Sequence, residues 1–172
     1  DEASGRAIDA GILTTSKTTA GVLTNVSWVM SLNTPGVADT VTLTKHVSGR
    51  VGGGACIEIV LPEVASAAHS WSMADADADA GGMVEFVEPM SGAGVASTQW
   101  NYASRTLLVV TTSSTSIKNH SKVVLRIRDL TTPSSVIDEA YTVSVTTYSS
   151  PTPDSNKIID GRTSISGVVM RS

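Results

Sequence analysis

The sequence predicts an all-β protein, an antiparallel β-sandwich of two sheets, with an Ig-like arrangement favoured over a jelly roll. Three observations support this prediction. The 172 residues include 24 Ser, 21 Thr and 21 Val, a composition typical of strands and turns. Apolar and polar residues alternate in several short runs, and no stretch keeps the period of an amphipathic helix. Short strands with polar outer faces bury their apolar rows only when two sheets stack.

The first predicted strand pair covers residues 22–32 and 40–47. The apolar residues of the first run share one parity: Val22, Val26, Trp28, Met30 and Leu32. The second run is expected to face inward through Val41, Leu43 and Val47, and outward through Thr40, Thr42, Thr44 and His46. Pro35 and Gly36 mark a turn between the runs, so we expect them to pair antiparallel.

Further strands are predicted at 55–61, 83–88, 105–112, 122–130 and 140–148. Cys56 lies in the first of these and is the only cysteine, so the chain has no internal disulfide. A small buried thiol is the simplest interpretation of Cys56, and a disulfide to another subunit is the alternative.

The two ends of the chain resemble each other. Residues 5–13 align without a gap with residues 161–169, with matches at Gly5/Gly161, Arg6/Arg162 and Gly11/Gly167. We therefore divide the chain into a linker or donor-like strand at 1–16, interpreted as the tail of a preceding repeat, and a sandwich domain at 17–172. Strand addition to a neighbouring sheet would use the apolar residues Ile8, Ile12, Leu13, Ile165, Val168 and Val169. The alternative is that each segment is an ordinary strand of its own sandwich.

Composition excludes some classes of partner and indicates a location. The net charge is −4 and basic residues are scattered, which argues against nucleic acid as a partner. No apolar run approaches the roughly 20 residues of a membrane-spanning helix. The abundance of Ser and Thr and two N-glycosylation motifs, at Asn25 and Asn119, favour an extracellular or cell-surface protein that carries glycans.

Three aspartates form a candidate calcium site. Asp75, Asp77 and Asp79 alternate with alanine, and three close carboxylates repel one another unless a cation is present. The pattern is similar to the start of an EF-hand loop, but Ala80 replaces its glycine and Phe86 its final glutamate. The alternative is a solvated acidic loop, and no other cofactor is expected.

No catalytic motif is found, and we do not expect an enzyme. His46, His69 and His120 are far apart in sequence, and neither a zinc-protease motif nor a serine-hydrolase motif occurs. A carbohydrate-binding module is an alternative function, in which Trp71, Trp100 and Tyr102 would stack on sugar rings. The competing interpretation is that these aromatic residues fill the ends of the sandwich.

Several segments resemble Ser/Thr-rich domains repeated in large surface proteins of algae and other protists. The segments are Thr19–Thr24, Trp28–Leu32, Ile57–Pro62, Ser104–Val110 and Tyr141–Thr147. The resemblance implies tandem sandwiches that serve as extracellular scaffold or appendage material. We therefore expect a structural subunit or repeat of an extracellular filament, sheath or adhesive surface protein that associates with itself head to tail. A calcium-dependent adhesion domain is a further alternative.

Overall fold

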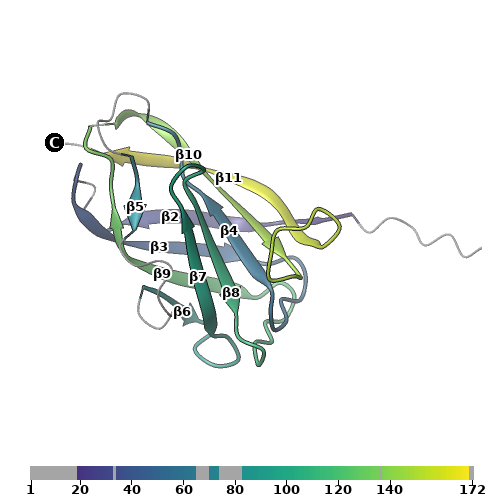
Figure 1. Ribbon diagram of the computed structural model, residues 1–172. Coiled ribbons are helices and arrows are strands. Elements are labelled where there is room, and N and C mark those ends of the chain that lie inside the picture. The colour runs from purple at the N-terminus through teal and green to yellow at the C-terminus, as the bar shows by residue number, and fades with distance from the viewer. Residues whose placement is uncertain (1–18, 33, 65–69, 74–82, 136, 171–172) are drawn as a thin grey trace, which may run out of the picture.

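The computed structural model describes residues 19–32, 34–64, 70–73, 83–135 and 137–170, with the backbone alone at 137–141 and 166–170. Its regular secondary structure in these ranges consists of β-strands in two sheets that pack face to face (Figure 1). The prediction of an all-β, two-sheet sandwich is confirmed. The described residues contain no helix that could cross a membrane.

The first sheet has six strands in the order β1-β11-β10-β4-β8-β7. The strands span Gly21–Val22 (β1), Ile158–Met170 (β11), Ile137–Tyr148 (β10), Cys56–Val60 (β4), Thr106–Thr111 (β8) and Val95–Asn101 (β7). All neighbours pair antiparallel except β1 and β11, which pair parallel. The sheet therefore joins a strand from the start of the described chain to one from its end.

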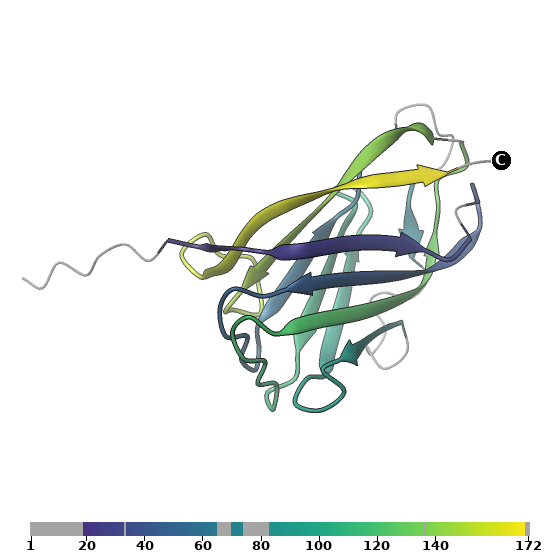
Figure 2. The same ribbon diagram turned by 180° about the vertical axis from the view of Figure 1, so that it is seen from behind.

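The second sheet follows the order β2-β3-β9-β5, and β6 also pairs with β9. The strands span Thr24–Met30 (β2), Ala38–His46 (β3), Lys122–Thr131 (β9), Ser72–Met73 (β5) and Val84–Glu88 (β6). The predicted antiparallel pairing of the first two runs is confirmed by β2 and β3. In Figure 2, β2 of this sheet and β11 of the other lie side by side along one flank of the sandwich.

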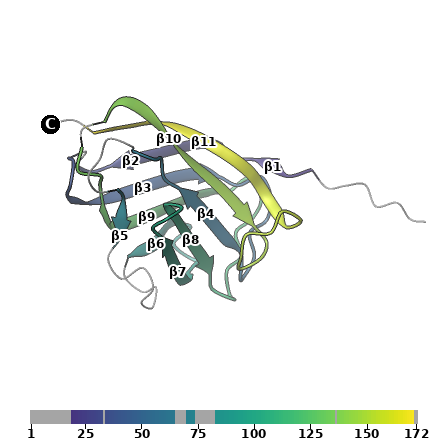
Figure 3. The same cartoon turned by 45° about the horizontal axis from the view of Figure 1, so that its top comes forward.

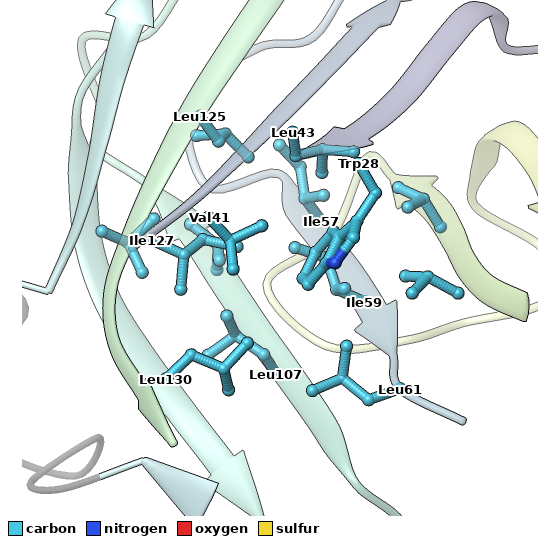
Figure 4. Close-up of a cluster of buried hydrophobic side chains, with 14 of the residues drawn as sticks. Trp28, Val41, Leu43, Ile57, Ile59, Leu61, Leu107, Leu125, Ile127 and Leu130 are labelled. Atoms are coloured by element: carbon cyan, nitrogen blue, oxygen red, sulfur yellow. The ribbon is translucent and has the colours of Figure 1, made fainter. Parts of the chain in front are cut away.

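The core lies between the sheets and is built from alternate residues of facing strands. Figure 4 shows Val41 and Leu43 of β3 near Ile57 and Ile59 of β4, with Trp28 of β2 beside them. Each of these side chains is buried, and each buried aliphatic side chain stabilises the fold by roughly 1.5–3 kcal/mol before entropy is subtracted. The outward-facing residues of β3 alternate with them and are half-buried, as their parity predicts.

One parity prediction is wrong at both ends of its run. Trp28 and Met30 are buried as expected, but Val22 is 69% exposed and Leu32 is 60% exposed. Val22 belongs to β1 in the other sheet, and Leu32 lies in a bend beyond β2. A bulge between Thr24 and Ser27, with Asn25 at φ 50°, also interrupts the alternation, because a bulge changes which side chains face inward.

Candidate functional site

The parallel pairing of β1 with β11 joins the first strand of the described chain to the last. Gly21 pairs with Asp160 and Val22 with Gly161. A Cβ atom at Gly21 would lie 1.6 Å from Ser48 Oγ, so the backbone of β1 comes closer to Ser48 than any other residue type allows. Glycine at this position therefore lets the short β1 strand join the sheet.

A buried polar cluster supports this strand pair from inside the sandwich. Asp160 is fully buried, and its Oδ1 accepts hydrogen bonds from the Ser48 backbone N–H (2.8 Å) and from the Ser48 hydroxyl. Thr147 pairs with Asp160 across β10 and β11. Lys45, which is also fully buried, reaches across from β3 and donates from Nζ to Thr147 Oγ1 at 2.7 Å. The cluster thus connects the two sheets next to β1.

The electrostatics of this cluster follow from its burial. Removal from water lowers the pKa of the Lys45 ammonium to about 8, although the charges of Asp160 and Cys56 oppose the change. Asp160 Oδ2 is buried and has no hydrogen-bond partner among the described residues. Lys45 and Asp160 are therefore two buried ionisable groups that influence each other through their charges, while their hydrogen bonds go to Thr147 and Ser48.

The same pairing determines at which ends of the sandwich the described chain begins and ends. Because β1 runs parallel to β11 and pairs with the start of it, the described chain begins at one end of the sandwich. It leaves at Met170, the last residue of β11, roughly 30 Å away along that strand. Figure 3 shows β1 beside the start of β11, and Figure 1 shows β11 running to the opposite end. We call these the N-terminal end and the C-terminal end of the sandwich.

A hollow of about 660 Å³ lies at the N-terminal end. It is formed between the residues that precede β1 and the turn that joins β10 to β11, and its lining residues are Thr19, Ala20, Ser149, Ser155, Asn156, Lys157 and Ile158. The hollow therefore adjoins the point at which residues 1–18 connect to the sandwich.

The two predicted donor segments have different outcomes. Ile8, Ile12 and Leu13 lie outside the described residues. Ile165 is 6% exposed and belongs to the core of its own sandwich, where β11 pairs with β10. Val168 and Val169 lie on the same strand. In this structure the C-terminal segment pairs with β10 of its own sheet, as in the alternative interpretation, and its addition to a neighbouring sheet stays a prediction.

The glycosylation motifs and the acidic loop can be placed in part. Asn25 and Asn119 are both exposed, as attachment of a glycan requires. Asp75, Asp77 and Asp79 lie outside the described residues. Among those that are described, no three His, Cys, Asp or Glu side chains are grouped so that they could hold a metal ion.

The two glutamates nearest to the acidic loop pair with β9. Glu85 Oε1 accepts from Arg126 at 2.7 Å and from Arg128 at 2.8 Å, and Glu88 accepts from Lys122 at 3.2 Å. These ion pairs are half-exposed, and they connect β6 to β9 on the outer face of the second sheet. In the structure, both carboxylates therefore pair with basic side chains of β9.

The histidines occupy unrelated positions. His46 is half-buried on the outer face of β3, and His120 is exposed in a turn with φ 58°. His69 lies outside the described residues.

The three aromatic residues named from sequence lie close together, but they are not equally accessible. Trp71 is 1% exposed and donates from Nε1 to the Pro62 carbonyl at 3.1 Å. Trp100 is 7% exposed, on the inner face of β7. Both indoles contribute to the core, which agrees with the interpretation that they fill the sandwich and not with the alternative of an exposed stacking pair. Tyr102 is 62% exposed.

A second hollow, of about 490 Å³, opens beside Tyr102 at the C-terminal end. Four separate parts of the chain line it, through Gly36, Ser70, Trp71, Ser72, Tyr102, Thr131, Thr132 and Ser134. None of these lining residues carries a charge, and six of them carry a hydroxyl group. Sequence identifies Trp71 and Tyr102 among these residues but not the others, which come together only through the pairing of β5 with β9 and the neighbouring turns.

Comparison with known proteins gives little further guidance. No protein-family model matches the chain, and no curated protein matches it significantly. Among solved structures, the chain is similar to BslA, a bacterial hydrophobin, with 15% sequence identity and a TM-score of 0.42. The superposition covers 84% of this chain and 95% of that one.

Proposed function

We propose that this protein is a structural subunit of an extracellular filament, sheath or adhesive surface protein, and that it assembles head to tail. The parallel β1–β11 pair carries the proposal, because it separates the start and the end of the sandwich by the length of β11. A unit whose two connections leave from opposite ends extends a line of copies without folding back on itself. Head-to-tail contacts that do not close into a ring generate filaments.

Features of the surface support the same role. β7 is the outermost strand of the first sheet in the described part of the chain, and its sequence contains no charged residue. Natural sheets usually protect such edges with charges or proline, so an uncharged edge is suited to strand addition. Residues 1–16 would supply the added strand, since they precede β1 at the end where the N-terminal hollow lies.

Sedimentation velocity and electron microscopy of the purified chain test this proposal. We expect linear assemblies that lengthen with protein concentration. A variant that lacks residues 1–16 should remain monomeric, while its circular dichroism spectrum and thermal unfolding match those of the full chain. If the full chain stays monomeric at high concentration, or if the deletion leaves assembly unchanged, the proposal is overturned.

The mass of material from the native source tests the extracellular part of the proposal. Asn25 and Asn119 are exposed, so a secreted chain should carry glycans at one or both positions. We expect the intact mass of the native material to fall after enzymatic removal of N-linked sugar, and peptide mapping to assign the lost mass to Asn25, Asn119 or both. An unmodified mass would contradict glycosylation and leave the assembly test unaffected.

A further inference from the structure

We infer that the hollow beside Tyr102 is a binding site for neutral carbohydrate. This inference goes beyond the proposed structural role and does not depend on it. It is based on three properties of the C-terminal hollow: an exposed aromatic ring held in a fixed position, a lining of uncharged hydroxyl groups, and a volume suitable for a small ligand.

Tyr102 presents an aromatic ring whose orientation is fixed at two points. Its hydroxyl donates to the Met73 carbonyl at 3.1 Å. Its ring meets that of Trp100 edge to face, with centroids 6.0 Å apart and planes at 82°. Trp100 is itself buried, so it holds the tyrosine from the core side. A ring positioned before binding loses little conformational entropy when a ligand stacks on it.

The exposure of Tyr102 is unusual for so large a side chain. More than half of its surface, 62%, faces solvent, although two buried tryptophans nearby show that this end of the sandwich can enclose aromatic rings. An aromatic face beside polar groups suits a ligand with both an apolar face and hydroxyl groups. Sugar rings have this character, because their C–H groups gather on one face and their hydroxyls project around the rim.

The lining of the hollow selects against charged ligands. Ser70, Ser72, Thr131 and Ser134 supply hydroxyls from two segments of the chain, and none of the described lining residues is acidic or basic. A phosphate or carboxylate ligand would need a basic partner, and a cation would need carboxylates. Hydroxyl groups both donate and accept, which matches the hydroxyls of an uncharged sugar.

The dimensions of the hollow agree with this assignment. Its volume of about 490 Å³ lies within the range of about 300–1,000 Å³ that is usual for small-molecule sites. The floor is rigid, because Trp71 is anchored to Pro62, and the Thr132 hydroxyl, deep in the same wall, donates to the Thr34 carbonyl at 2.6 Å. A rigid floor and a fixed aromatic ring together form a preformed site.

Glycan-array screening followed by nuclear magnetic resonance titration of the full chain tests the inference. The probes are short neutral cello-, chito-, manno- and galacto-oligosaccharides, with sulfated and sialylated glycans as charged comparisons. We expect a neutral probe to bind, with chemical-shift changes centred on Tyr102, Ser72 and Thr131. Binding of charged glycans alone, binding of none, or shift changes centred elsewhere would overturn the assignment.

Substitutions of Tyr102 then measure how much its aromatic ring contributes to the affinity for sugar. Tyr102→Ala should weaken binding about tenfold or more, equivalent to about 1.4 kcal/mol. Tyr102→Phe keeps the ring, loses its anchor at Met73 and should weaken binding less. Met90→Ala is the matched control, because Met90 is 92% exposed but does not line the hollow, and it should leave binding unchanged. Equal affinity of Tyr102→Ala and the native chain would contradict the inference.

A blocking substitution keeps the test decisive if Tyr102→Ala fails to fold. Ser70→Arg places a long side chain at the exposed rim of the hollow, away from the core, and should abolish binding. The hollow also lies at the end where a second copy would approach in a filament. Shift changes at the hollow that depend on protein concentration and not on sugar would assign it to self-association and overturn carbohydrate binding.

Discussion

Lys45 is the residue whose surroundings differ most from those its type prefers. Its parity on β3 places it in line with Val41 and Leu43, so its side chain enters the interior of the sandwich. Thr147 accepts its hydrogen bond, and Asp160 provides a negative charge nearby. Alternation alone identifies this position as inward, but the identity of the partners depends on how two distant strands come together.

The lowered pKa of Lys45 predicts a distinctive dependence of stability on pH. The ordinary lysine pKa of 10.5 applies to the unfolded chain, whereas the folded value is about 8. Between these values the unfolded chain binds more protons, so the free energy of unfolding should rise with pH. We expect a gain of about 1 kcal/mol between pH 8 and pH 9, measured by urea denaturation. Below pH 8 the cost of burying the ammonium is present in full.

The variant Lys45→Met should not show this rise in the free energy of unfolding between pH 8 and pH 9. The control variant Lys118→Met, which replaces an exposed lysine, should still show it. The measurement is confined to pH 8–9 because Cys56 and Tyr148 act mainly at higher pH, and the contribution of Lys45 is taken as the difference between the two variants. Burial raises the pKa of Cys56 from 9.0 to about 11 and that of Tyr148 from 10.0 to about 12, and Glu58 adds to both changes. Those two groups lower stability as pH rises above their unfolded values. An identical slope in Lys45→Met and the native chain would contradict the assignment.

Cys56 is predicted to be inert in the folded protein. Its side chain is fully buried, and its raised pKa leaves very little thiolate at neutral pH. A thiol-specific reagent should therefore react with Cys56 only as fast as the protein unfolds, and at once in denaturant. Rapid labelling of the native chain, or a disulfide-linked dimer under non-reducing conditions, would refute this.

At the scale of elements, sequence predicts strands well where apolar residues alternate strictly. The runs at 55–61, 105–112 and 122–130 correspond closely to β4, β8 and β9. β7 was missed because its sequence is mostly polar, and only the buried residues Thr98 and Trp100 mark its inner face. The position of β7 at the sheet edge explains this, since an edge strand buries less surface than a central one.

The start of the second strand shows why periodicity alone is insufficient. A continuous run was expected from residue 22 to residue 32, whereas the chain changes sheets at Leu23 and bulges at Asn25. Asn tolerates the positive φ that such a bulge uses, but many exposed asparagines do not adopt it. The asparagine at position 25 therefore permits the bulge in the strand, but it does not by itself predict one.

The junction of β1 with β11 can be tested by a pair of glycine substitutions. Gly21→Ala forces a Cβ atom to within 2.5 Å of Ser48 Cβ and should lower the free energy of unfolding by about 1–3 kcal/mol. Gly52→Ala is the control, because a Cβ atom there meets nothing within 4 Å. We expect the control to be neutral or slightly stabilising in urea denaturation. Equal stability of both variants would show that β1 is not packed as described.

At the scale of the whole molecule, the sandwich could be predicted from sequence, but the candidate site could not. Tyr102 and Trp71 were named from sequence because they are aromatic and lie beside turns. Trp71 is buried where β5 pairs with β9, a contact between segments far apart in the chain, whereas Tyr102 is exposed directly after β7. Sequence therefore identified the residue types of the hollow and not their arrangement.

The direction of the end strands predicts how the molecule resists force. Tension between the termini pulls β1 and β11 past each other along their length, so the hydrogen bonds between them are loaded together. β11 is loaded against β10 in the same way, over a much longer pairing. In single-molecule force spectroscopy, we expect a higher unfolding force through the termini than through handles at Asn119 and Lys157. Both of these positions are exposed in turns. An equal or lower force through the termini would contradict this prediction.

The pairing of β1 with β11 also affects how the chain folds while it is being synthesised. Within this domain, β1 and Lys45 are synthesised well before β11 and Asp160. The first sheet therefore cannot be completed until β11 has been synthesised, and contacts between such distant segments form slowly. A product that stops before residue 158 would lack β11, leave β10 unpaired on one side and be prone to aggregate.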